Sequence, residues 1–159
     1  MYASLAPCID RYGLVAVGAT DAHDRPAVVC EKWSIETQTR VLAKARIGLF
    51  VQPEGPWESR KSGYKLLEYV ANGVIPVAED NMAAREILGE DYEFLVPSGA
   101  WADALDRACS LSDSEARECL AALTDHTERF SYSETVHRWV DFVEDGKPQK
   151  LRANTMRLL

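Results

Sequence analysis

Three basic side chains gather at one point of an acidic protein. The 159-residue chain has a formal net charge of −7, yet Arg60, Lys61 and Lys65 lie together at the start of "RKSGYKLLEYVANGVIPVAED", residues 60–80. Lysine and arginine clusters of this kind bind phosphate or carboxylate groups in proteins. The cluster therefore raises the question of which anion it holds.

The spacing of these residues predicts one charged face on a helix. Apolar residues recur with helical period over 62–72, and positions 61, 65 and 68 share the opposite face. The N-terminus of such a helix, near Ser62 and Gly63, adds free N–H groups and partial positive charge. Lysines beside these N–H groups suit a diphosphate, and Gly63 would let a ligand approach the backbone closely. An acid one turn further along, Glu68, suits sugar hydroxyls.

A simpler interpretation of the same spacing stays open. Lys65 and Glu68 are three residues apart, so they could form an ordinary surface ion pair that stabilises the helix by a few tenths of a kcal/mol. Trp33, at the end of a predicted strand, also has two interpretations. It could stack on a nucleotide base, or it could pack in the core or at its rim.

Composition and charge indicate what general class of protein this chain belongs to. Apolar residues make up 47% of the chain and charged residues 27%, which is typical of a globular domain. The acidic balance argues against a nucleic-acid partner. No apolar run approaches the length of a membrane span, and no signal peptide is visible. The four cysteines lack metal-site spacing, so we expect reduced thiols in a cytoplasmic protein and no metal site.

Short apolar runs alternate with helical patterns along the first hundred residues. This alternation predicts an α/β fold, a Rossmann-like doubly wound parallel sheet followed by C-terminal helices. We expect strands at 13–18, 27–33, 47–51, 74–79 and 92–97, and helices at 1–12, 35–46, 62–72, 82–88, 99–110, 113–129 and 133–144. Ser34, Ser98, Ser112 and Ser133 are the expected N-caps. Ligands of such sheets bind at the carboxyl ends of the strands, where the basic cluster is expected.

The domain boundary follows from charge. Residues 1–146 are predicted to form one domain, and residues 147–159 a basic tail that contains no acid. The tail is expected either to be loosely docked or disordered, or to contact an anionic surface.

The central segment resembles the donor-binding segment of GT-B glycosyltransferases of the retaining kind. "KSGYKLLEYVANGVIPVAED" is similar to their motif in its Lys, Glu, Gly and Pro-Val positions, and "ARIGLFVQPEGPWESRKSGYK" is similar to the strand and loop before it. The residues that carry the resemblance are Ala45, Ile47, Gly48, Leu49, Pro53, Trp57, Lys61, Lys65, Glu68, Tyr69, Ala71, Gly73, Pro76, Val77 and Ala78.

The resemblance implies a nucleotide-sugar-binding domain that serves a hexosyltransferase of glycan biosynthesis. Lys61 and Lys65 would hold the donor diphosphate and Glu68 the ribose hydroxyls. Ser62, Gly63 and Tyr64 would supply backbone or stacking contacts, and Arg60 and Trp33 are further candidate donor contacts. The catalytic residues are unknown. The acceptor would be a sugar or lipid-linked hydroxyl, with no cofactor besides the donor, in an enzyme that is cytoplasmic or peripheral to the membrane.

Two departures from the family pattern matter. Arg60 stands where many relatives carry a glutamate, which leaves the contact with the sugar hydroxyls open. The first strand of the domain is also absent, together with the whole N-terminal domain. We therefore expect a fragment, or a chain that a missing domain or a partner completes, with the strands at 13–18 and 47–51 separated by a gap. Direct pairing of those two strands would contradict this expectation.

Three functions remain open at this point. The first is the donor-binding half of a glycosyltransferase. The second is half of a nucleotide-sugar 2-epimerase, which shares the architecture. The third is a non-catalytic remnant that binds a nucleotide or a partner subunit, which Arg60 and the missing strand favour.

Overall fold

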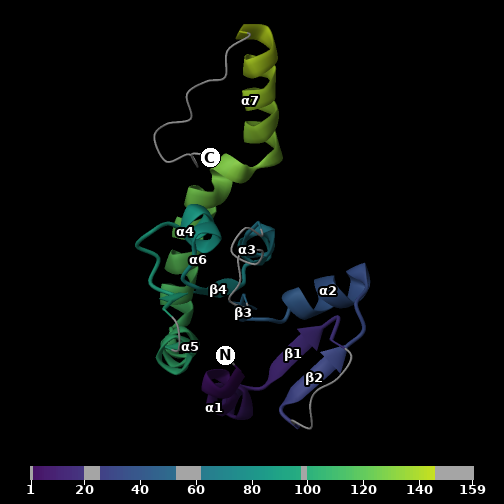
Figure 1. Ribbon diagram of the computed structural model, residues 1–159, viewed down its shortest axis with the longest axis vertical. Helices are drawn as coiled ribbons and strands as arrows, with labels where there is room; N and C mark the ends of the chain where they lie inside the picture. The colour runs from purple at the N-terminus through teal and green to yellow at the C-terminus, as the bar shows by residue number, and fades with distance from the viewer. Residues whose placement is uncertain (1, 20–25, 53–61, 98–99, 146–159) are drawn as a thin grey trace. The chain divides into compact units, whose positions relative to one another are not determined.

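The computed structural model describes residues 2–19, 26–52, 62–97 and 100–145 (Figure 1). The chain divides into two compact units, Met1–His126 and the segment from Thr127 onward. One domain over residues 1–146 stays a prediction, and the predicted basic tail, 147–159, lies outside the described residues.

Unit 1 alternates helices and strands, as the sequence predicted. Its elements are α1 (Tyr2–Tyr12), β1 (Leu14–Val17), β2 (Val28–Glu31), α2 (Ile35–Leu42), β3 (Ile47–Phe50), α3 (Tyr64–Ala71), β4 (Ile75–Glu79), α4 (Met82–Leu88), β5 (Leu95–Val96), α5 (Trp101–Ser110) and α6 (Asp113–Thr127). Unit 2 contains the 3₁₀ turn η2 (Glu128–Phe130) and α7 (Tyr132–Asp145).

The molecule has mixed α/β character, with short parallel sheets. β1 pairs with β2 in one two-stranded sheet, and β3, β4 and β5 form a three-stranded sheet in that order. All three pairings are parallel. Among the described residues β1 and β3 belong to different sheets, so the direct pairing that would have contradicted a missing strand is not observed.

One hydrophobic core touches both sheets. It contains Leu5 and Ile9 of α1, Leu105 of α5 and both Ile75 and Val77 of β4. Leu14 and Val28 of the two-stranded sheet, and Ile47 and Leu49 of β3, pack against the same core. α1 is also tied to α5 at the surface, where the Tyr12 hydroxyl donates to Asp106 at 2.8 Å. The two sheets thus present one side to the same pair of helices.

The other face of the two-stranded sheet is exposed. Val15 and Val29 are direct neighbours in the β1–β2 register, and they are 45% and 54% exposed. The unbroken apolar run of residues 13–18 is typical of a strand that is buried on both faces, and predicts such burial for β1. That prediction is wrong for the described structure, since no residue of β1 is fully buried and Val15 is exposed.

Helix boundaries follow local capping signals. Ser34 caps α2, accepting the Thr37 N–H at 3.1 Å, and the Ser112 and Glu115 pair forms the predicted capping box of α6. Asn81 caps α4 by accepting the Ala84 N–H at 2.9 Å. The predicted cap at Ser133 is wrong, because α7 begins one residue earlier and Ser131 accepts the Glu134 N–H.

Pro76 lies inside β4, the middle strand of the three-stranded sheet, where proline is normally excluded. Successive residues of a strand point their N–H and C=O groups to opposite neighbours. The Ala78 N–H bonds to Phe94 O of the segment leading into β5, so the groups of Pro76 point to that same side. The β4–β5 pairing begins only at Ala78, so the missing N–H costs no ladder bond, and the Tyr92 hydroxyl donates to Pro76 O at 2.8 Å.

Tyr69 fixes α3 against the three-stranded sheet. Its ring lies directly over Gly48 of β3, where an added Cβ would come within 2.6 Å of the ring. Its hydroxyl donates to Leu49 O at 3.0 Å. Burial, with a smaller contribution from Glu68, raises the pKa of Tyr69 to about 12. The glycine at position 48 is therefore required for helix-on-sheet packing.

We predict that Gly48→Ala destabilises unit 1 by about 1–3 kcal/mol, because the new methyl group displaces the Tyr69 ring from a packed site. Urea unfolding measures the change. In a Tyr69→Ala background the same glycine substitution should cost much less, since the clash is gone. An equal cost in both backgrounds would show that the ring does not require this glycine.

Candidate functional site

The predicted site lies where α3 begins, after the carboxyl end of β3. Gly63 precedes the first turn of α3 and packs beside the first turn of α4, with Ile87 and the carbonyl of Ala83 nearest to it. α4 follows the carboxyl end of β4 in the same way. The starts of two adjacent helices therefore meet at the carboxyl edge of the three-stranded sheet, the edge at which parallel α/β sheets bind ligands.

Two of the predicted basic residues cannot be placed at this edge. Arg60 and Lys61 lie outside the described residues. Ser62 is exposed, and Tyr64 is 70% exposed, so both are accessible from solvent. Ser62 does not cap α3, since the residue at the cap is Gly63 and no side chain bonds to the end of the helix there.

Gly63 is buried, and its lack of a side chain has a packing reason. A Cβ atom at this position would lie 2.5 Å from the Ile87 side chain and 3.2 Å from Ala83 O. The sequence favours a different role for Gly63, the close approach of a ligand to the backbone. In the described structure α4 fills that space, so only the backbone of Gly63 remains as a candidate contact.

Lys65 is exposed in the first turn of α3. No ion pair joins it to Glu68, and no other carboxylate of the described residues pairs with it. The surface pair that was the simpler interpretation of the sequence is therefore not formed. A lysine without an acidic partner at the N-terminal end of a helix is available to an anion.

Glu68 belongs to a hydrogen-bonded chain of three side chains. Gln38 of α2 donates its side-chain N–H to the Glu68 carboxylate, and the Trp33 indole N–H donates to Gln38 Oε1 at 2.7 Å. Both the nitrogen and the oxygen of the Gln38 side-chain amide are thus hydrogen-bonded, which fixes the orientation of the amide. The amide nitrogen in turn positions one carboxylate oxygen of Glu68. Trp33 itself is 58% exposed, so it does not pack in the core.

Gln38 was missed by the sequence analysis. A signal existed, because the indole N–H of Trp33 needs an acceptor and Gln38 lies one turn into the helix that Ser34 caps. Nothing in the spacing alone related Gln38 to Glu68, which is 30 positions away.

A second cluster of hydrogen-bonded polar side chains lies at the carboxyl ends of β3 and β4. The Gln52 N–H donates to the Glu79 carboxylate at 3.0 Å, and the Asn81 side chain donates to Gln52 Oε1 at 3.0 Å. Asp80 accepts two hydrogen bonds from Arg85, at 2.5 and 2.7 Å. These hydrogen bonds, together with the charge of the guanidinium, hold the pKa of Asp80 below its ordinary value. The edge is therefore polar and hydrogen-bonded.

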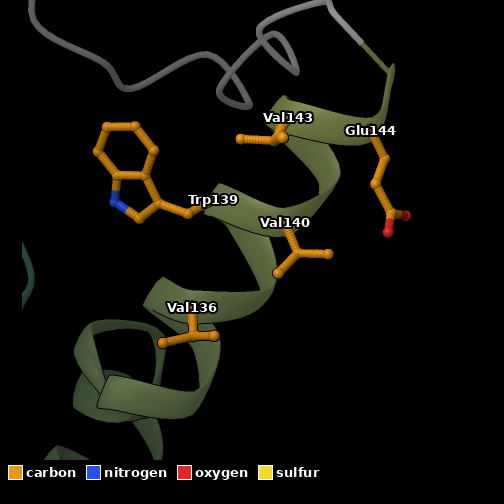
Figure 2. Close-up of a pocket in the computed structure, with 5 residues that line it drawn as sticks. All are labelled: Val136, Trp139, Val140, Val143 and Glu144. Carbon is orange, nitrogen blue, oxygen red and sulfur yellow. The ribbon is translucent and has the colours of Figure 1, made fainter.

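The described residues form two surface hollows, one on each unit. One is lined by residues at the amino ends of β3 and β4, including Lys44, Arg46 and Ile75, and Arg46 there pairs with Asp113 at 3.0 Å. The other is on unit 2, and Figure 2 shows that all of its lining residues come from α7: Val136, Trp139, Val140, Val143 and Glu144. A hollow formed by one helix is an open apolar face, so it resembles a contact surface more than a ligand pocket.

The described ranges contain neither a metal-binding cluster nor a helix that could span a membrane. No group of three or more His, Cys, Asp or Glu side chains there could hold a metal ion. None of the described helices combines the length and the apolar character that crossing a bilayer requires.

Comparison with known proteins identifies no relative. No protein-family model, curated protein or solved structure matches this chain.

We predict that Gln38→Ala destabilises unit 1 by about 0.5–1.5 kcal/mol, because Trp33 and Glu68 lose a shared partner. Unfolding of the single and double variants with Glu68→Ala measures the coupling, and the double variant should cost less than the sum. Thr39→Ala, the exposed neighbour on α2, is the matched control. Strict additivity of the two substitutions would rule out the hydrogen bond.

The Asp80–Arg85 pair predicts a dependence of stability on pH. The pKa of Asp80 is lower in the folded chain, so its contribution is present above about pH 4 and is lost as the pH falls through the folded value. Asp80→Asn should lower the melting temperature at pH 7, at a cost of about 1 kcal/mol or less, and the difference from wild type should shrink below about pH 4. Asp91→Asn, at an exposed position, is the control. A difference that stays constant down to pH 3 would contradict the pairing.

Proposed function

We propose that unit 1 binds a nucleotide-diphosphate sugar at the start of α3, as the donor-binding half of a retaining GT-B-type glycosyltransferase. The proposal rests on the sequence resemblance of residues 60–80 and on one observation. Lys65 is exposed, without an acidic partner among the described residues, in the first turn of a helix at the carboxyl edge of a parallel sheet.

The chemistry of this position supports binding of a diphosphate. In the first turn of α3 the Leu66 N–H bonds to Gly63 O, while the N–H groups of Tyr64 and Lys65 have no intrahelical acceptor, and no acid occupies this turn. Lys65 adds a full positive charge next to these donors. In a transferase the leaving nucleoside diphosphate gains negative charge in the transition state, and cationic groups that are fixed before the reaction stabilise that charge without reorganisation.

The position of Glu68 supports recognition of sugar hydroxyls. Gln38 holds one oxygen of its carboxylate, which orients the acid, and the other oxygen accepts no hydrogen bond from the described residues. A carboxylate one turn along the helix from the diphosphate donors suits a ribose that is attached to that diphosphate.

The strand arrangement supports a Rossmann-like, doubly wound sheet as the finer description of the fold. The order β2–β1 followed by β3–β4–β5 corresponds to the order 3-2-1-4-5-6 of this architecture when its first strand is left out. Helices also cover both faces of the three-stranded sheet, with α3 over Gly48 and α5 over Ile75 and Val77.

A non-catalytic nucleotide-binding module is the second candidate function. The observation in its favour is the division into two sheets, because a central interruption removes a loop that could carry a further donor contact. Such a module would bind the nucleotide without transferring or epimerising the sugar. Unit 1 contributes binding residues in either case, and the two candidates differ in turnover.

Calorimetry with UDP, GDP and their sugars tests the proposal. We predict that one of these nucleotides binds, and that Lys65→Ala weakens its binding about tenfold or more, which corresponds to roughly 1.4 kcal/mol. Lys44→Ala is the matched control, because Lys44 is an exposed lysine at the opposite, amino edge of the same sheet. Absence of binding at millimolar nucleotide, or equal effects of the two substitutions, would exclude the donor site.

Assays of turnover separate the candidates once binding is found. Transfer of the sugar to a hydroxyl acceptor, or to water, would identify a transferase. Binding without turnover would favour a half-enzyme or the non-catalytic module. Formation of an epimer would identify a nucleotide-sugar 2-epimerase, and would exclude both the transferase and the non-catalytic module.

A further inference from the structure

The hollow at the amino ends of β3 and β4 has the size of a ligand site. Its volume is about 490 Å³, and sites for small molecules in proteins measure about 300–1,000 Å³. Its walls come from three parts of unit 1 that are far apart in the sequence: the connection between α2 and β3, the entry to β4, and the start of α6. All of its lining residues lie in the described ranges.

The hollow is positively charged. Lys44, Arg46 and Arg117 line it, and Asp113 is the one acid among its lining residues. Three positive charges against one negative charge leave an excess of two, on a chain whose formal net charge is −7. A concave surface with an excess of one sign of charge concentrates ions of the other sign, so this hollow attracts anions.

The two arginines differ in what they have left to offer an anion. Arg46 donates to the Asp113 carboxylate at 3.0 Å and also to Leu111 O, so its guanidinium is already bonded to protein. Arg117 donates its Nε to Asp113 O at 2.9 Å, and no acid of the described residues pairs with it. Its two terminal nitrogens therefore stay available, and they carry the N–H groups that bind a planar carboxylate.

The floor of the hollow is apolar. Ile75 and Ala116 belong to the hydrophobic core of unit 1, and Leu120 packs against that core. A Cβ atom added to Gly73 would meet nothing within 4 Å, so the φ of +70° and not close packing accounts for this glycine, and the space beside it is open. A ligand with a hydrocarbon part would remove such a floor from water, which a simple inorganic anion would not do.

We propose that this hollow binds a small carboxylate whose hydrocarbon part lies on the apolar floor. Arg117 is the main contact of the carboxylate, and Lys44 and Arg46 contribute charge beside it. The site goes beyond the proposed nucleotide site and shares no residue with it, because it lies at the amino ends of the strands and the nucleotide site at their carboxyl ends.

An NMR titration of the 159-residue chain with octanoate is the first test. The amide signals of Ala45, Gly73 and Ala116 should shift and saturate, with a dissociation constant of about 1 mM or below. Octanol, which lacks the charge, and acetate, which lacks the hydrocarbon chain, should each bind at least tenfold more weakly. Inorganic phosphate that binds the hollow as tightly as octanoate would show a simple anion site and overturn the proposal.

Substitution of Arg117 tests the charged contact. Arg117→Gln should weaken octanoate binding at least fivefold and leave the melting temperature nearly unchanged, because the side chain is exposed and its one hydrogen bond lies within α6. Lys65→Ala, at the carboxyl edge of the same sheet, is the control and should bind octanoate as wild type does. Unchanged binding in Arg117→Gln, or an equal loss in both variants, would contradict the site.

The location of the shifts also decides the result. Shifts at Val136 and Val140 without shifts at the hollow would show that octanoate binds the exposed apolar face of α7, and the proposal would fail. The outcome is independent of the nucleotide titrations. Lys65→Ala should weaken nucleotide binding alone and Arg117→Gln octanoate binding alone, so failure of either site can be told from failure of the other.

Discussion

The contact between the Tyr69 ring and Gly48 fixes the position of α3 on the three-stranded sheet, and the candidate site depends on it. Because position 48 has no side chain, the ring lies flat against the strand and the helix comes close to the sheet. The hydroxyl then reaches Leu49 O, which holds the helix in one place along β3. Gly63 repeats the arrangement at the start of the helix, where Ile87 of α4 occupies the space that a side chain would need. Two glycines thus lock α3 between β3 and α4.

This packing determines which side chains of α3 face outward. Leu66 and Val70 are buried, Lys65 is exposed, and Glu68 bonds to Gln38 of α2. The cation and the acid are consequently separated in function. Lys65 remains available to an external anion, whereas Glu68 is oriented by protein. In an ordinary surface ion pair, Lys65 and Glu68 would have neutralised each other. The absence of that pair from the described residues therefore supports the proposed donor site.

The division of the strands into two sheets also divides their carboxyl edge. In parallel sheets the carboxyl ends of neighbouring strands share an edge, and the loops there form the binding surface. With β1 and β3 in separate sheets of the described structure, that surface has two parts, and the part over β3 and β4 carries the hydrogen-bonded side chains of Gln52, Glu79 and Asn81. The apolar face of α7 in unit 2 is a separate feature, for which no covering element is described.

The sequence by itself determined the order of the elements and many of their ends, because these depend on local physics. Apolar runs and helical periodicity located the five strands of the described residues to within a few residues, and Ser34 and Ser112 marked helix starts as N-caps. The pattern also brought Lys65 and Glu68 onto one helix. Only the tertiary structure decided that Gly63 serves packing, that Glu68 bonds to Gln38 and that Val15 and Val29 are exposed, since each depends on residues far away in the chain. The division into two sheets was expected from a resemblance and not from any local signal, because strand pairing is a long-range choice that periodicity does not encode.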